Sequence, residues 1–332
     1  MKLLITYFTD RFSVLEDHWA KGQTGNDEVV SLVEEHQPLD LGGRIDILDW
    51  DTKTIERTVQ VRTPFGADYD GENFFVTTGH DDWLNWGDGT MLRVYDRDLK
   101  QVRTFSNPNL ADVHDMSLTE DKKGLLISSS GLDLILGTDL YGNTTHTWYA
   151  TDHGFKEDQK GRTRTIEKEI DHRKRVYMTP QQTTHVNGVF EQNGKHYATL
   201  WVQGAAIEID PETGEFREVV TGLTHPHSFL PTANGGYIVS DTRYRYPNEE
   251  DSKTHYGRVL LFDDKFQQTM ALEDDFCWVQ DARVVPMGKD YGILVADSNN
   301  HRINLYDMQG KKSDTYQYDR ELKIATMTLI DE

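Results

Sequence analysis

One pattern recurs along the chain and limits the folds open to it: a β-strand, a turn that contains glycine, and a second, more apolar strand. Five segments share this pattern, and they begin at Thr63, His114, His185, His227 and Gln280. A second strand pair usually follows, as in "LRVYDRDLKQVRTF" and "INLYDMQGKKSDTY", where aspartate and glycine supply tight turns. Four strands that recur at intervals of roughly 40–70 residues are typical of a β-propeller.

The two ends of the chain supply a sixth unit. Its strands are expected at residues 322–330, 2–8, 44–50 and 54–61, so that C-terminal and N-terminal segments share one blade. A shared blade closes the ring and removes its open sheet edges. The sequence therefore predicts an all-β protein, a six-bladed β-propeller in which residues 1–332 form a single domain. A seventh blade would need a longer chain.

Four long insertions interrupt the short hairpins, at residues 9–43, 80–89, 152–184 and 242–256. In the predicted register all four fall on the face of the ring where the inner strands begin. Loops longer than about 12–15 residues in a compact domain are usually functional or disordered. The insertion 152–184 has a basic, mixed-charge composition in an acidic chain, and we expect a loop or lid on the channel face. Its arginines are candidates for contacting an anionic substrate: Arg162, Arg164, Arg173 and Arg175.

Histidines stand where three of the inner strands begin. His114, His185 and His227 start the segments "HDM", "HVN" and "HSF". The first strand of each blade lines the central channel, so equivalent positions in consecutive blades predict three imidazoles that converge at the channel mouth. Three imidazoles are a common ligand set for a divalent transition metal, with zinc favoured and iron, copper or manganese as alternatives. His225 is an alternative ligand to His227, and each histidine taken singly is also compatible with a structural role.

Other side chains are expected at the same mouth. The segment "QDAR" places Gln280, Asp281 and Arg283 on the next inner strand, and we take these three as candidate catalytic residues. Arg283 is suited to stabilise developing negative charge. The substrate rim is expected to contain Arg62, Trp201, Arg243 and Tyr244. The last two belong to "TRYRYP", which alternates arginine and tyrosine beside the mouth.

Two short stretches resemble known propeller families. The segment "LVADSNNHRINLYDMQGK" (294–311) resembles a blade of the NHL-repeat group, which includes scaffolds and the peptidyl-hydroxyglycine lyase, whose propeller holds zinc on three histidines. The motifs "HD" at 114–115, "HVN" at 185–187 and "QDAR" at 280–283 resemble those of the six-bladed arylsulfotransferase group. In that group a histidine occupies the position of Gln280. The first resemblance implies metal chemistry or scaffolding, and the second implies metal-free transfer by a histidine.

The composition bears on partners and location. The formal net charge of −21 repels nucleic acid and anionic membranes and attracts cations. No apolar stretch approaches the 18 residues of a membrane span, and the N-terminus lacks the pattern of a signal peptide. The single cysteine, Cys277, excludes an intrachain disulfide. We therefore expect a cytoplasmic protein without nucleic-acid or membrane partners.

Three functions remain open from the sequence. The first is a metal-dependent enzyme of lyase or hydrolase type that acts on a small, possibly anionic molecule at the channel mouth. The second is metal-free group transfer by one of the histidines. The third is a binding or scaffold propeller with a protein partner, because the fold alone does not determine the function. The metal content of the protein separates the first from the other two.

Overall fold

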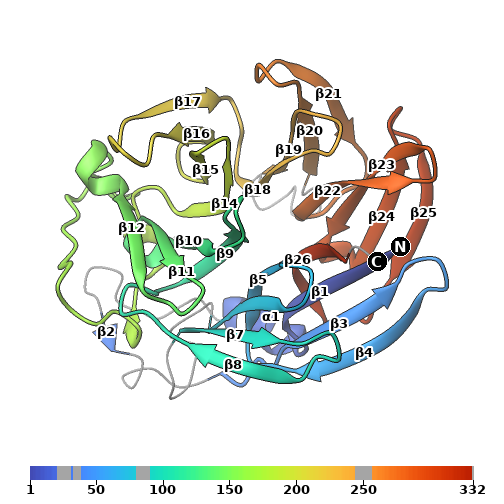
Figure 1. Ribbon diagram of the computed structural model, residues 1–332, viewed down its shortest axis with the longest axis horizontal. Coiled ribbons are helices and arrows are strands. Elements are labelled where there is room, and N and C mark those ends of the chain that lie inside the picture. Colours follow the sequence, from blue (N-terminus) through green and yellow to red (C-terminus); the bar gives the residue numbers. More distant parts are fainter. Residues whose placement is uncertain (21–30, 33–38, 80–89, 244–255, 331–332) are drawn as a thin grey trace.

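A computed structural model describes residues 1–20, 31–32, 39–79, 90–243 and 256–330. Six four-stranded antiparallel sheets stand as blades around a central axis (Figure 1). The all-β, six-bladed propeller expected from the repeats is therefore confirmed. Among the described residues, no helix is long and apolar enough to cross a membrane.

The closing blade contains both ends of the chain. It consists of β26 (Lys323–Ile330), β1 (Lys2–Thr9), β3 (Arg44–Asp49) and β4 (Thr54–Gln60). The C-terminal strand β26 is the innermost strand and pairs antiparallel with β1, which places the two termini side by side (Figure 1). This is the arrangement that the sequence predicts, and it leaves the ring without a gap between its first and last strands.

The other five blades run from inner to outer strand in chain order. They are β5 (Pro64–Tyr69), β6 (Phe74–Thr78), β7 (Met91–Tyr95) and β8 (Gln101–Phe105); β9 (Val113–Leu118), β10 (Gly124–Ser129), β11 (Leu134–Asp139) and β12 (Thr144–Tyr149); β14 (Val186–Gln192), β15 (Lys195–Leu200), β16 (Ala205–Ile209) and β17 (Phe216–Val220); β18 (Pro226–Pro231), β19 (Tyr237–Arg243), β20 (Tyr256–Phe262) and β21 (Gln268–Glu273); and β22 (Val279–Met287), β23 (Asp290–Asp297), β24 (Arg302–Asp307) and β25 (Lys312–Gln317). Short 3-10 helices η3 (Ser130–Leu132) and η6 (Ser298–Asn300) precede the third strand in two blades.

The hydrophobic core lies between neighbouring blades. One cluster, for example, joins Leu3 and Ile5 of the closing blade to Leu294 and Ile303 of the blade before it. The outermost strands are largely exposed, as in β4 and β25. Each sheet thus buries both faces of its middle strands against neighbouring blades and meets solvent at its outer edge, which explains why the second strands are apolar and the outermost strands polar.

Each inner strand has a β-bulge near its start, where the pairing with the second strand shifts. In four blades a hydroxyl of the second strand accepts a hydrogen bond from the bulged backbone N–H: Ser128 from Asp115 (2.7 Å), Thr199 from Gly188 (2.8 Å), Ser240 from Ser228 (2.8 Å) and Thr6 from Thr326 (3.1 Å). Three of these hydroxyls also donate to a carbonyl of the next blade, Thr6 to Phe65, Thr199 to His227 and Ser240 to Gln280. The same hydroxyl therefore fixes the strand register and joins adjacent blades.

This shared bulge defines two rings of equivalent residues at one end of the channel. The mouth ring contains the residue just before the inner strand in five blades and the first residue of β26 in the closing blade: Thr63, Asp112, His185, His225, Trp278 and Lys323. The second ring lies two residues further along each chain segment: Phe65, His114, Asn187, His227, Gln280 and Ala325. His185 therefore belongs to the mouth ring, whereas His114 and His227 belong to the second ring. The expectation that the three histidines are equivalent is corrected by this two-residue offset.

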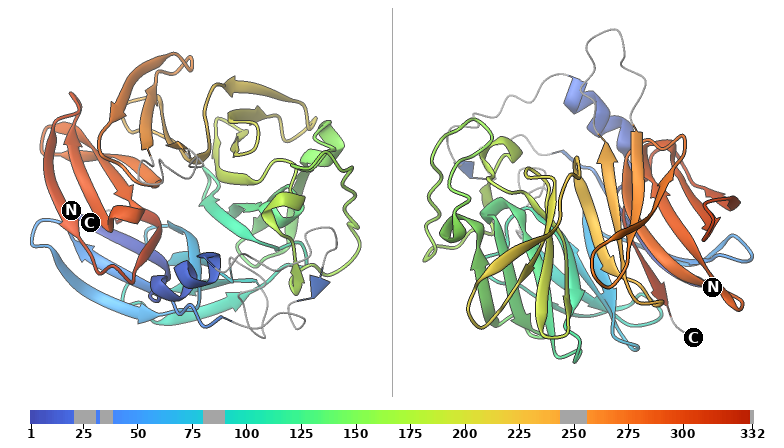
Figure 2. Two further views of the ribbon diagram at one scale, coloured as in Figure 1. Left: turned by 180° about the vertical axis from the view of Figure 1, so that it is seen from behind. Right: turned by 90° about the horizontal axis from the view of Figure 1, so that it is seen from above.

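The insertions add structure on the mouth side. Residues 9–43 contribute α1 (Phe12–Ala20) and β2 (Ser31–Leu32), and α1 stands over one face of the ring (Figure 2). Residues 152–184 follow η4 (Ala150–His153) and contain β13 (Arg175–Val176) and η5 (Thr179–Gln181). The two insertions meet, because β13 pairs with β2. The insertion 80–89, and most of 242–256, lie outside the described residues.

Candidate metal centre

Asp112, His114 and His185 come together at the channel mouth. Asp112 and His114 flank the first residue of β9, and His185 directly precedes β14 of the next blade. The His114 Nε2 atom lies 3.5 Å from Asp112 Oδ1, and the centroids of the two imidazole rings are 4.4 Å apart. One candidate ligand atom from each residue lies within 4.8 Å of the others. Two imidazoles and one carboxylate are thus close enough to share a metal ion.

A buried glutamine orients two of these three side chains. The Gln182 Nε2 group donates to Asp112 Oδ2 at 2.6 Å and to the Tyr177 carbonyl at 3.2 Å, and Gln182 Oε1 contacts His185 Nδ1. Because an amide oxygen only accepts hydrogen bonds, His185 Nδ1 carries the proton in this contact. The lone pair of the neutral imidazole is then on Nε2, as a metal ligand requires. The donor set therefore fits a divalent ion.

The loop before β14 is fixed by a carboxylate from the neighbouring blade. Asp133, which is fully buried, accepts hydrogen bonds from the backbone N–H groups of Thr184 (2.8 Å) and His185 (3.1 Å). Its other oxygen pairs with Arg164 Nη1 at 2.8 Å. His185 has a left-handed backbone, with φ of 49°, which costs on the order of 1–3 kcal/mol for a residue other than glycine. These hydrogen bonds hold the strained residue beside His114.

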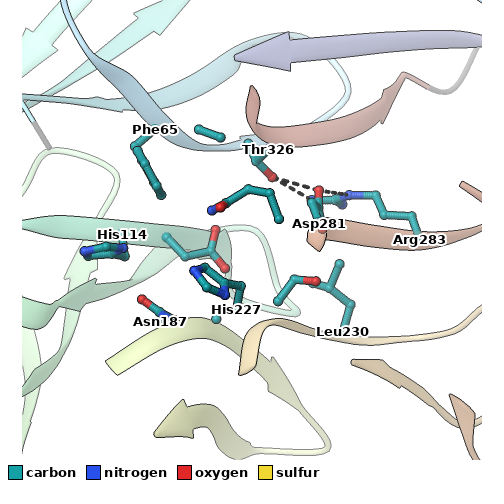
Figure 3. Close-up of a pocket in the computed structure, with 13 residues that line it drawn as sticks. Phe65, His114, Asn187, His227, Leu230, Asp281, Arg283 and Thr326 are labelled. Carbon is teal, nitrogen blue, oxygen red and sulfur yellow. Dashed lines mark hydrogen bonds and ion pairs between the residues drawn. The ribbon is translucent and has the colours of Figure 1, made fainter. Parts of the chain in front are cut away.

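His227 is outside this three-residue group. It occupies the second ring on β18 and lines the same cavity as His114 (Figure 3). Its Nδ1 atom lies 3.2 Å from the His225 carbonyl, and its ring meets Trp278 edge-on at 5.3 Å. Of the three histidines expected to share a metal, the structure thus brings two together with Asp112 and places the third elsewhere around the cavity.

The "QDAR" residues Gln280, Asp281 and Arg283 line the same cavity, with Gln280 in the second ring. Asp281 Oδ2 accepts hydrogen bonds from Arg283 Nε (3.1 Å), Thr326 Oγ1 (3.1 Å) and the Met327 N–H (2.9 Å), part of the network drawn in Figure 3. Gln280 Oε1 accepts a hydrogen bond from the Trp278 indole at 2.6 Å. Their catalytic role stays a prediction, and their contacts show how the charge of Arg283 is balanced within the channel.

Buried charge continues below the second ring. Burial raises the pKa of Asp115 to about 7, and the negative charge of Asp281 acts in the same direction, whereas Arg283 opposes it. The cavity that these residues line has a volume of about 20 Å³, which is room for roughly one water molecule. This part of the channel is therefore narrow.

The expected rim residues have different environments. Trp201 lies edge-on to His185, with ring centroids 5.3 Å apart, and stacks on His225 at 4.0 Å. It therefore forms an aromatic wall directly beside the candidate metal ligand. Arg62 is exposed just before β5. The side chain of Arg243 and all of Tyr244 lie outside the described part of the chain.

Three arginines of the insertion are engaged in ion pairs, and the fourth, Arg175, lies in β13. Arg164 is largely buried between Asp133 and the carbonyl of Gln181, at 2.8 and 2.7 Å. Arg162 pairs with Asp158 at 2.6 Å, and Arg173 pairs with Asp171. Arg164 therefore supports the loop that carries His185, a structural role in place of the substrate contact expected from the sequence.

No protein-family model matches the chain, and no curated protein matches it. Among solved structures, the chain is similar to one in the nidogen/laminin complex, at 12% identity and a TM-score of 0.58 over 99% of this chain and 98% of that chain. It is also similar to a protein of unknown function from Bacteroides caccae, at 13% identity and a TM-score of 0.55 over 86% of this chain and 94% of that chain. At such identities the likeness concerns the fold alone, and membership of the NHL-repeat or arylsulfotransferase group is not confirmed.

Proposed function

We propose that the protein is a metal-dependent enzyme of lyase or hydrolase type that acts on a small molecule at the channel mouth. The proposal rests on one observation: Asp112, His114 and His185 present a carboxylate and two imidazoles within 4.8 Å of one another. Three protein ligands are the usual number in catalytic zinc sites, which keep a position open for water or substrate. A bound ion would polarise a carbonyl or acidify water.

The chain's own residues support this chemistry in three ways. Gln182 holds His185 in the tautomer that ligates through Nε2. Trp201 and His225 form an aromatic wall beside that ligand, suited to limit the access of water from one side of the site. The net charge of −21 raises the local concentration of cations.

Zinc is the proposed ion, because hydrolysis and elimination need no redox change, and iron, copper and manganese are alternatives for the same ligand set. The substrate is proposed to be small, with nucleic acid and membranes as unfavourable partners of so acidic a chain. A single cysteine is compatible with a reducing compartment such as the cytoplasm.

Elemental analysis tests the proposal directly. The chain is purified without a histidine tag, beside a His185→Ala variant, and both are analysed for transition metals. We expect close to one ion per chain in the parent and none in the variant. A parent that stays free of metal after incubation with each of the four ions would contradict the proposal. Metal-free transfer by a histidine, or a binding propeller, would then be the better account.

A further inference from the structure

Lys323 occupies the mouth ring on the side opposite to His185. The inner strands follow one another around the channel in the order β26, β5, β9, β14, β18 and β22. Three steps therefore separate β26 from β14 in either direction. Lys323 is the first residue of β26, and its equivalence to His185 follows from the bulge and from the hydrogen bond of the Thr326 N–H to Thr6 Oγ1. The mouth thus has a candidate metal centre on one side and an amine on the other.

The surroundings of this amine are apolar. Lys323 is 3% exposed, and its Nζ atom lies 4.5 Å from the centroid of the Phe12 ring on α1 and 5.8 Å from that of Trp278. Among the described residues, no carboxylate lies within ion-pair distance of it. The titratable groups that influence it from neighbouring elements are Glu16, Cys277, Asp297 and His301.

Such an environment favours a neutral amine. Moving an ammonium group out of water without a carboxylate partner is unfavourable. Desolvation lowers the pKa of Lys323 to about 7, although Cys277, Glu16 and Asp297 act in the opposite direction. About half of the Lys323 amines are then uncharged at pH 7, compared with roughly one in 2,500 for a lysine with the ordinary pKa of about 10.4. A desolvated lysine of this kind is an activated nucleophile.

We propose that Lys323 forms a Schiff base with the carbonyl group of a small aldehyde or ketone bound at the channel mouth. The nitrogen lone pair adds to the carbonyl carbon, and a proton moves from nitrogen to oxygen to give a carbinolamine. A proton from solvent then converts the hydroxyl group into water, which leaves as the nitrogen lone pair forms the C=N bond, and a protonated imine remains, so no oxidant or reductant is needed. The inference deepens the proposed function, because it names a carbonyl compound as the substrate class for the same mouth.

Reductive trapping on metal-free protein tests this inference independently of the metal. The full chain is treated with a chelator, then with acetaldehyde or pyruvate and cyanoborohydride at pH 7, and modified lysines are located by peptide mass spectrometry. We expect Lys323 to react at least about tenfold faster than Lys195, a half-buried lysine whose pKa is raised by its hydrogen bond to Asp210. Labelling at Lys323 that is no faster than at Lys195 would overturn the inference.

Two variants complete the test. Lys323→Met removes the amine, and Lys323→Arg keeps a cation that forms no imine, so each should lose the fast adduct while a Lys195→Met control keeps it. Circular dichroism confirms that the variants compared are folded, and the arginine variant serves if the methionine variant is not. A fast adduct that persists in either folded Lys323 variant would place the reactive amine elsewhere and refute the proposal. Because no metal is present, these results are separate from those on the metal centre.

Discussion

The loops that lead into the inner strands are held in two different ways. Before β18 and β22, an aspartate from the second strand of the same blade accepts backbone hydrogen bonds from the loop and pairs with an arginine of the third strand. These pairs are Asp241 with Arg258, at 2.7 Å, and Asp297 with Arg302, at 2.8 Å. The arrangement repeats from one blade to the next, which indicates that it serves the fold.

Before β14 the arrangement is different. The carboxylate that holds the loop, Asp133, comes from the neighbouring blade, and its arginine, Arg164, comes from the insertion 152–184. This loop carries His185, so the insertion and the adjacent blade together position a candidate ligand. The comparison teaches that the repeated contacts build the propeller and that the site lies where the repeat is interrupted. Substitutions at Asp133 and Asp241 test this difference.

The largest effect is expected from Asp133→Ala. The variant leaves Arg164 without its carboxylate in a buried setting and removes the acceptor of three backbone N–H groups. Removing one partner of a buried pair costs about 3–5 kcal/mol, so the free energy of unfolding in urea should fall by this amount, and zinc binding should weaken with it. Asp121→Ala, in an exposed turn, is the control and should cost less than about 1 kcal/mol. Equal losses in the two variants would contradict the role of Asp133.

Asp241→Ala sharpens the comparison. Its partner Arg258 is more exposed than Arg164, so we expect a smaller loss of about 3 kcal/mol in the free energy of unfolding. Zinc affinity, measured by calorimetry on the folded variant, should stay within about threefold of the parent. Asp241 supports the loop before β18, whereas His185 precedes β14, and substitutions at separate sites usually act independently of one another. A variant that lost zinc affinity as strongly as Asp133→Ala would show that the two kinds of loop support are not functionally distinct.

Gln182→Leu tests the orientation of the ligands. The leucine removes the amide that contacts both Asp112 and His185, and loss of such outer contacts usually weakens metal affinity about 10–100-fold. Gln203→Leu is the matched control, since Gln203 donates only to the Thr183 carbonyl in the same loop. Zinc titration of both variants should show weaker binding for the first alone. Equal affinities would mean that Gln182 does not orient the ligands.

The repeats were sufficient to predict the ring and its closing blade, because strand alternation and turn residues are local signals. The register at the channel mouth was harder. The sequence places histidines at three strand starts. Measured from the shared bulge, however, His185 lies two residues earlier than His114. A local signal for this register does exist, in the hydroxyl residues of the second strands, such as Ser128 and Thr199, that bind the bulged N–H.

The remaining site residues depended on contacts between distant segments. Asp112 precedes His114 by two positions and could have been noticed as an Asp-x-His pattern. Gln182 lies in a long insertion, and Lys323 occupies the mouth ring only because β26 closes the ring from the other end of the chain. Pattern alone does not bring such residues together, since their proximity depends on the packing of blades that are far apart in sequence.

The smallest effect on stability is expected from His196 on β15, whose ring packs against that of His146 on β12. Burial lowers the pKa of His196 to about 4, and the neighbouring His146 contributes. The unfolded chain therefore binds a proton that the folded protein does not between about pH 6.5 and pH 4, so stability is lost as the pH falls through this window. The free energy of unfolding, measured in urea, falls between pH 7 and pH 5 in the parent. In His196→Phe this fall should be smaller by on the order of 1 kcal/mol. An unchanged slope would contradict a neutral, buried His196.

The most direct test of the account is which residues hold the ion. Zinc affinity is measured by calorimetry on the parent, on Asp112→Asn and on His227→Ala, each checked for folding. We expect one ion per chain in the parent, a loss of more than about 100-fold in affinity for Asp112→Asn, beyond the range of outer contacts, and an unchanged affinity for His227→Ala. Unchanged binding in Asp112→Asn together with lost binding in His227→Ala would contradict the site proposed for Asp112, His114 and His185.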